Sequence, residues 1–291
     1  MLRHALRLSP AVLLLVVAAA RNPAAETAPA AGWLDRLNFY RASAALPPVA
    51  EDPQLSGAVR AHARYMVMHD AVRHSQKRRD SWATPEGAAA AAVSNLAGST
   101  RLTEPESWAV DLWMQAPFHA LGILDPALNT VGFGIHRAQK NRIQTAAGLD
   151  VIRGRRVVPQ SVSYPIVWPA PGTTVPIATH VEEYPSPLTS CPGYQAPTGL
   201  PLIVQLGADG ELPRVTGSWI ADDRGELEHC TFDGGTYRNR DAAQQQLART
   251  ILAARNAIVV IPREPLRPGV SYRAVVEVNG HLIDWTFGVT P

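Results

Sequence analysis

Apolar side chains recur at helical spacing in the first part of the chain. Trp33, Leu37 and either Tyr40 or Arg41 recur at this spacing, and the prolines at 47 and 48 end the pattern. A second helix is predicted to start at Asp52-Pro53, because proline fits the first helical turn. The face of this helix that is predicted to be buried consists of Leu55, Val59, His62, Ala63 and Met66. Among such neighbours, His62 is interpreted as a packed core histidine.

A third helix is predicted to follow Thr103. Thr103 and Glu106 have the spacing of a capping box, with Pro105 in the first turn. The stripe predicted to be buried consists of Trp108, Leu112 and Trp113. Pro117 ends the pattern, since its ring removes a helical hydrogen bond and disfavours the helical conformation of the residue before it.

His119 therefore lies just past a break in the helical pattern. Asp125-Pro126 then indicates a turn, and the run VGFGI at 131–135 alternates apolar residues with glycines. A strand has glycines at such positions where another backbone or a ligand comes close. The segment thus places a histidine at the junction of a helix and a strand.

The second half of the chain changes to short apolar runs between turn residues. Four prolines between 165 and 176 predict a stiff linker, and we place a domain boundary near Pro159. Strands are predicted at 200–206, 215–220, 258–261, 270–278 and 281–289. Asn279-Gly280, between the last two, is a strong hairpin signal. This spacing predicts a β-sandwich, with a helix or helical loop from Asp241 to Ala254 as the exception.

Charge and the N-terminus narrow the function classes. The chain of 291 residues holds 27 basic and 25 acidic residues, which gives no reason to expect nucleic-acid binding. Residues 1–25 combine Arg3 and Arg7 with an apolar core and small residues, the pattern of a signal peptide. Cleavage is predicted near Ala20 or Ala25, and an uncleaved anchor is the alternative. No later segment reaches the apolar length of a membrane span, so no transmembrane anchor is expected after cleavage.

Export also decides how the two cysteines are interpreted. In an oxidising compartment Cys191 and Cys230 are more consistent with a disulfide than with a catalytic pair. Closing a loop of about forty residues would stabilise the fold by roughly 3 to 4 kcal/mol on the chain-entropy model. The protein is therefore predicted to be secreted or to lie in the cell envelope.

Two stretches of the chain resemble known families. The run W-x-x-x-P-x-H-x-x-x-I-L-x-P-x-x-x-x-V-G-x-G, at 113–134, resembles the SCP-like (CAP) superfamily of secreted proteins, particularly its bacterial extracellular branch. The two earlier helices fit the opening of that family, through Asn38, Arg41, Leu55, Val59, His62, Ala63 and Met66. The chain end resembles bacterial Ig-like domains through Pro262, Pro265, Leu266, Pro268, Gly269 and Tyr272. The resemblance implies an α+β protein: an α-β-α sandwich CAP domain at 30–158 and an all-β Ig-like sandwich with a proline-rich start at 159–291.

The resemblance also implies a cleft with two histidines. His74, followed by Ser75, matches one of them and His119 the other. The segment SNLAGS at 94–99, interpreted as a loop, stands where the family has G-E-N-I-A, so Ser94 replaces a glutamate while Asn95 is kept. A second glutamate of many members is Ala116 here. The predicted cleft residues are His74, Ser75, Ser94, Asn95 and His119.

Losing both carboxylates leaves His74 and His119 as the only predicted metal ligands. A tightly held zinc ion requires three or four ligands. The hydrogen-bond acceptors that orient histidine rings are predicted to be missing too. Only weak binding of a divalent metal, and no cofactor, is therefore expected. His180-Val-Glu-Glu is interpreted as a chance cluster, because it lacks the second histidine of a zinc helix.

Two functions stay open. The chain lacks a G-x-S-x-G elbow, an H-E-x-x-H helix, a phosphate loop and a dinucleotide fingerprint, so no catalytic residue is assigned. The first hypothesis is a non-enzymatic binding module for a small-molecule, lipid or envelope ligand. The alternative is a secreted hydrolase that uses the two histidines, with Ser75 or Ser94 as imaginable nucleophiles. Lys77, Arg78 and Arg79 are interpreted as a solvated charge run.

Overall fold

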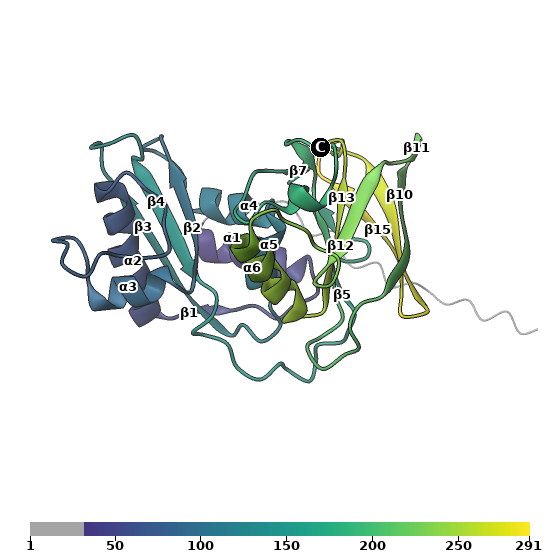
Figure 1. The fold of residues 1–291 in the computed structure, drawn as a ribbon, viewed down its shortest axis with the longest axis horizontal. Coiled ribbons are helices and arrows are strands. Elements are labelled where there is room, and N and C mark those ends of the chain that lie inside the picture. Colours follow the sequence, from purple (N-terminus) through teal and green to yellow (C-terminus); the bar gives the residue numbers. More distant parts are fainter. Residues whose placement is uncertain (1–31) are drawn as a thin grey trace, which may run out of the picture.

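The computed structural model describes residues 32–291, so the predicted signal peptide at 1–25 and its cleavage sites lie outside the described residues. Figure 1 shows two parts side by side along the longest axis of the molecule, a mixed helix and sheet part formed by the first half and a part rich in strands formed by the second. The mixed content is as predicted. Within the described residues, no helix has both the length and the apolar character of a membrane span.

The N-terminal part has a four-stranded sheet with helices on both faces. Its strands, in the order β1-β3-β4-β2, are β1 (Ala50–Glu51), β3 (Thr130–Arg137), β4 (Thr145–Asp150) and β2 (Ser94–Ser99). Its helices are α1 (Trp33–Ala42), α2 (Pro53–Met68), α3 (Pro85–Ala91), α4 (Ser107–Met114) and α5 (Pro117–Ile123). In Figure 1, α2 and α3 lie at the outer face and α1 and α4 at the face towards the second part. SNLAGS is therefore strand β2 and not a loop, paired antiparallel with β4.

Strand β3 is the centre of this part because its two faces receive different helices. Phe133 stacks on Trp33 of α1, with ring centroids 4.8 Å apart. On the opposite face, a Cβ built on Gly134 would lie 2.2 Å from the backbone nitrogen of Arg60, and one on Gly132 would meet α2 equally closely. The two glycines thus let the helix backbone approach the strand, which confirms the reason predicted for them.

Helix α2 begins as predicted, whereas α4 does not. The side chain of Asp52 accepts from the backbone N–H groups of the first turn of α2. Helix α4 starts only at Ser107, and neither Thr103 nor Glu106 caps it with its side chain, so the predicted capping box is wrong. The reason is tertiary. The carbonyl of Glu104 accepts from Arg137 Nη2 at 2.7 Å, which holds this segment outside the helix.

The predicted stripe of α4 is also only partly buried. Trp113 is buried, and its indole N–H donates to the carbonyl of Leu96 at 3.2 Å. Trp108 and Leu112 are half-buried, and the residues of α4 that fill the core beside Trp113 are Ala109, Val110 and Met114. After Gln115 the chain breaks and restarts as α5 with Pro117 in the first turn, so His119 lies inside a short helix.

The C-terminal part consists of two main sheets. One has the order β11-β10-β14-β15-β6 and the other the order β12-β13-β9-β5, while β7 and β8 form a separate pair. The strands are β5 (Ile166–Trp168), β6 (Thr174–Val175), β7 (Thr179–His180), β8 (Thr198–Gly199), β9 (Leu202–Gln205), β10 (Val215–Asp222), β11 (Gly225–Glu226), β12 (His229–Asp233), β13 (Ala257–Pro262), β14 (Ser271–Val278) and β15 (His281–Val289). The predicted strands are confirmed, as is the helix at 241–254, which is α6 (Ala242–Ala253). Asn279 and Gly280 both have positive φ, 53° and 78°, as the predicted hairpin turn requires.

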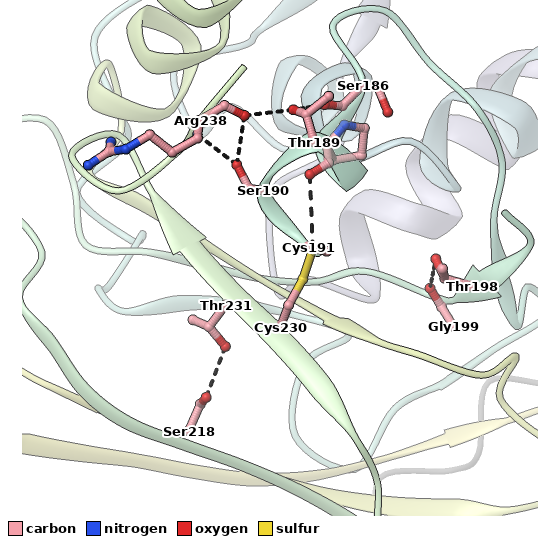
Figure 2. The surroundings of a disulfide bond; sticks show 11 residues. Ser186, Thr189, Ser190, Cys191, Thr198, Gly199, Ser218, Cys230, Thr231 and Arg238 are labelled. Carbon is pink, nitrogen blue, oxygen red and sulfur yellow. Dashed lines mark hydrogen bonds between the residues drawn. A yellow bond between two sulfur atoms is a disulfide. The ribbon is translucent and has the colours of Figure 1, made fainter. Parts of the chain in front are cut away.

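The predicted disulfide between Cys191 and Cys230 is confirmed. Cys191 follows the 3₁₀ helix η1 (Pro187–Ser190), and Cys230 lies on β12 (Figure 2). Near it, the hydroxyl groups of Thr189 and Ser190 both donate to the carbonyl of Arg238, at 2.7 and 3.2 Å. The bridge therefore fixes η1 to the second sheet.

The two parts share one apolar core, which continues across the predicted boundary near Pro159. Buried polar contacts join them as well. Asp125 pairs with Arg255 of the C-terminal part at 2.5 Å. The indole N–H of Trp168 donates to Ser43 Oγ at 3.0 Å. This extensive contact allows the second part to contribute side chains to a site in the first.

Candidate functional site

A cavity of about 460 Å³ brings the two predicted histidines together at the junction of the two parts. The residues that line it are Val72, Arg73, His74, Leu96, Ala97, Gly98, Leu112, Trp113, Ala116, His119, Val181, Glu182, Glu183 and Tyr184. The first ten come from the N-terminal part and the last four from the segment that follows β7. The cavity is thus formed by both parts of the molecule.

The surface of this cavity divides into an apolar and a polar region. Strand β2 supplies Leu96 and Ala97, and the end of α4 supplies Leu112 and Trp113. The charged and imidazole side chains are Arg73, His74 and His119 from the N-terminal part and Glu182 and Glu183 from the segment after β7. An apolar surface with few polar groups is typical of small-molecule sites, where the polar groups fix the orientation of the ligand.

His74 lies in the loop between α2 and α3 and is held by a backbone carbonyl. Its Nδ1 lies 2.9 Å from the carbonyl oxygen of Ala91. Because a carbonyl only accepts, Nδ1 carries the proton and Nε2 holds the lone pair. Burial lowers the pKa of His74, the bond to Ala91 opposes this, and the nearby His119 lowers the pKa further. The ring is therefore neutral at neutral pH.

His119 lies in the first turn of α5 and is held by a carboxylate. Its Nδ1 donates to Glu183 Oε2 over 2.6 Å. Its backbone carbonyl accepts from the side-chain amide of Asn95 at 3.0 Å. Pro117 starts α5 two residues before this histidine, so the break in the sequence pattern lies beside a ring that lines the cavity. Within the described residues, Nε2 of neither histidine has a hydrogen-bond partner.

Glu183 is the functional residue that the sequence pattern did not reveal. Its side chain is 1% exposed. Besides His119 Nδ1, its carboxylate accepts from the backbone N–H groups of Phe118 at 3.1 Å and His119 at 3.3 Å. A buried carboxylate needs such partners, and here all three belong to the start of α5. The C-terminal part thus orients the His119 ring through a single side chain.

Two other contacts hold the segment that carries Glu183 in place. His180 Nδ1 bonds to the carbonyl oxygen of Gln115 at 2.9 Å, and Thr179 Oγ1 donates to Gln115 Oε1 at 3.1 Å. The sequence shows no metal-binding motif at 180–183, but Glu183 of this cluster contacts His119. Its only sequence signal was two acids beside a histidine in a proline-rich stretch. The partner lies 64 residues away along the chain.

Two sequence expectations about the cleft need correction. The positions of Ser94 and Ala116 hold no carboxylate, but Glu183 supplies one from the C-terminal part. The ring-orienting acceptors predicted to be missing are also present, as the Ala91 carbonyl for His74 and the Glu183 carboxylate for His119.

The remaining predicted cleft residues lie outside the cavity surface. Ser75 is exposed in the loop after His74. Ser94 is buried, and its Oγ has no partner in the described part of the chain. Asn95 is buried and acts on the site indirectly, through the backbone of His119. The segment at 94–99 lines the cavity with its middle residues instead, from Leu96 to Gly98.

The donor set fits a weakly held divalent cation better than a tightly held one. No group of three or more His, Cys, Asp or Glu side chains with metal-binding geometry is found between residues 32 and 291. The candidate ligands are Nε2 of His74 and of His119, and each ring donates its other N–H to an oxygen acceptor, as metal-binding histidines do. A cation held there would supply a Lewis acid with open positions for water or a ligand.

His62 and His69 take no part in this site. His62 is fully buried, with Nε2 bonded to the carbonyl of Arg73 at 2.8 Å and Nδ1 to the amide of Gln76 at 3.0 Å. This confirms a core histidine, with both nitrogens satisfied. Burial lowers its pKa, and the Arg73 bond only partly opposes that effect. His69 lies 3.0 Å from Asp80 at the end of α2, away from the cavity.

One comparison with known proteins bears on this arrangement. Residues 34–146 match the family model described as CAP, the cysteine-rich secretory protein family. The matched range contains His74 and His119, whereas Glu183 lies beyond it. The match supports the CAP superfamily for the N-terminal part. A search of curated proteins found no match to the chain.

Proposed function

We propose that the protein is a secreted or cell-envelope binding protein that holds a small ligand between His74 and His119 without chemical conversion. One observation supports this above all. Each ring has its Nδ1 engaged by a protein acceptor, and both rings line the same cavity. Two oriented imidazoles that keep Nε2 available provide directional contacts to a ligand oxygen or to a weakly bound cation.

The lining suggests the class of ligand. An apolar body would contact Leu96, Leu112 and Trp113, while a polar group would lie near the histidines. The volume of about 460 Å³ falls within the range of about 300 to 1,000 Å³ that is usual for small-molecule sites. An amphipathic small molecule, from the envelope or a lipid, fits both features.

The C-terminal part is proposed to be an Ig-like module that presents this cleft at the cell envelope. Its two main sheets contribute to one core, and Tyr272 Oη accepts from the backbone N–H of Arg267 at 2.6 Å in the segment that resembles such domains. The disulfide in this part is consistent with an oxidising compartment. Removal of residues 1–25 as a signal peptide belongs to the same proposal.

The alternative, a hydrolase that uses the two histidines, is less well supported. Among the described residues that line the cavity there is no serine, threonine or cysteine, so a side-chain nucleophile of the usual kind is missing beside the rings. Ser75 and Ser94, the serines considered from sequence, lie elsewhere.

The proposal is tested by identifying the small molecules that remain bound to the purified, exported protein. Native mass spectrometry followed by denaturation should release one or a few amphipathic compounds. Leu112→Glu puts a charge on the apolar wall and should abolish retention, whereas Leu247→Glu, on exposed α6, should leave it unchanged. Equal retention by the two variants, each with an unchanged circular dichroism spectrum, would contradict the proposal. Turnover of a released compound by the wild-type protein would favour the hydrolase.

A further inference from the structure

A second, open groove lies at the outer end of the N-terminal part, between α2 and the end of β3. Its volume is about 550 Å³. Arg60, Arg64 and Arg137 form its basic walls, together with His136. In Figure 1, α2 and β3 lie at the end of the long axis opposite β10 and β11. This groove is thus separate from the cavity between the two parts.

The arginines of this groove lack acidic partners. Within residues 32–291, no carboxylate forms an ion pair with Arg60, Arg64 or Arg137. Arg273 of the C-terminal part, by contrast, is exposed and pairs with Asp284 at 2.5 Å. Unpaired guanidinium groups along one groove create a positive potential that attracts anions.

The ring of Trp82 brings Arg64 of the groove close to a further cation, Lys140. The guanidinium of Arg64 lies 4.3 Å from the ring centre of Trp82, and the ammonium of Lys140 lies 5.5 Å from it. The loop with Trp82 also carries Lys77, Arg78 and Arg79, all exposed. These three residues, predicted to be a solvated charge run, therefore belong to the loop that packs beside the groove.

The groove also affects a titratable group. Burial lowers the pKa of His136, and the positive charge of Arg64 lowers it further. Arg64 of α2 thus presents a positive charge to this ring. An anion bound between Arg60 and Arg64 would relieve this repulsion.

We propose that this groove binds a linear acidic polysaccharide. Gly57 and Ala61 form part of the floor and leave room for a chain to approach the helix. Guanidinium groups on both sides match sulfate, phosphate or carboxylate groups that repeat along such a polymer.

Two other classes of polyanion fit less well. A membrane surface would be expected to contact large exposed apolar side chains, and none of those that the described chain exposes lines this groove. Single-stranded nucleic acid would require free aromatic faces, but the ring of Trp82 is covered by Arg64 and Lys140.

The test measures binding of the full chain to heparin, as a linear sulfated polysaccharide, by calorimetry at low and at physiological ionic strength. Arg60→Glu/Arg64→Glu should weaken binding by at least about tenfold, and added salt should weaken the wild type as well. Arg60→Lys/Arg64→Lys keeps the charge but loses the guanidinium groups, so its affinity should lie between those of the wild type and the charge-reversal variant. Arg214→Glu/Arg240→Glu makes the same change of charge at exposed arginines of the C-terminal part, and it should bind like the wild type.

Three outcomes would overturn the proposal. The first is a wild-type protein that does not bind heparin at low salt. The second is an equal loss in the two charge-reversal variants, which would indicate a nonspecific effect of net charge. The third is tighter binding to phosphatidylglycerol vesicles or to an oligonucleotide than to heparin, which would assign the groove to another class of partner.

Discussion

The two parts of the molecule contribute different chemistry to one cavity. The N-terminal part supplies both imidazoles and most of the apolar wall, and it holds His74 with a carbonyl of its own, that of Ala91. The C-terminal part supplies no imidazole to the cavity but provides the buried carboxylate of Glu183, which holds His119. The motifs of the N-terminal part therefore indicate both histidines, but they do not indicate the carboxylate that orients His119.

The largest expected effect comes from breaking the contact between the parts at Asp125. This carboxylate is 2% exposed and pairs with Arg255, which is itself only 10% exposed. Asp125→Ala leaves that guanidinium buried without its partner, so we expect a loss of about 3 to 5 kcal/mol in the free energy of unfolding. Urea denaturation measures this loss. Asp284→Ala, which breaks an exposed pair with Arg273, should cost less than about 1 kcal/mol, and equal costs would contradict the account.

The disulfide should have the next largest effect, confined to the C-terminal part. The two cysteines are 39 residues apart, so replacing both by serine should reduce stability by about 3 to 4 kcal/mol. The same denaturation experiment measures this change. A free-thiol assay on unreduced, denatured wild-type protein should find neither thiol, and two reactive thiols would contradict the bridge.

Zinc affinity tests the contribution of the C-terminal part to the cavity. Glu183→Gln removes the carboxylate that accepts from His119 Nδ1, so we expect zinc binding to weaken by about ten- to a hundredfold. Glu182→Gln is the matched control, because this residue also lines the cavity but, among the described residues, the carboxylate bonded to His119 is that of Glu183. Calorimetry measures both, and a loss of the same size in the control would mean that only the charge of the cavity matters.

A smaller effect concerns pH and the core of the N-terminal part. Because burial lowers the pKa of His62 below its usual value of about 6.5, the unfolded chain binds more protons than the folded one below that pH. Stability should therefore be lower at about pH 5.5 than at about pH 7. Urea titrations at the two pH values should show a smaller difference in His62→Gln. An unchanged difference would show that His62 is not responsible.

Local patterns were sufficient to predict much of the fold. Asp52 caps α2, and Asn279-Gly280 turns the last hairpin, because both signals depend only on neighbouring residues. The capping box at Thr103 failed because Arg137, far along the chain, binds the carbonyl of Glu104. The spacing of residues within the capping box does not show that a distant side chain will bind the same segment.

The same limit applies to the candidate site. His74 and His119 could be recognised because each lies beside a motif, whereas the contact of Glu183 with His119 depends on how the second part packs against α5. The position of Ser94 at the start of the SNLAGS segment predicts a cleft residue. In the structure, Leu96, Ala97 and Gly98 of the same strand line the cavity instead. The sequence therefore predicted the residues that lie within a motif, but not the residue that the second part brings to the site.

The central claim is that the C-terminal part, through Glu183, orients His119 to share one cavity with His74. The most direct measurement is a zinc titration of the full chain followed by nitrogen NMR of the histidine rings. In the wild type, Nε2 of His74 and of His119 should shift together, while Nδ1 of both rings stays protonated. In Glu183→Gln, the His119 response should weaken and that of His74 should decrease with it. Zinc-dependent shifts at only one ring, or the same response in Glu183→Gln as in the wild type, would contradict the account.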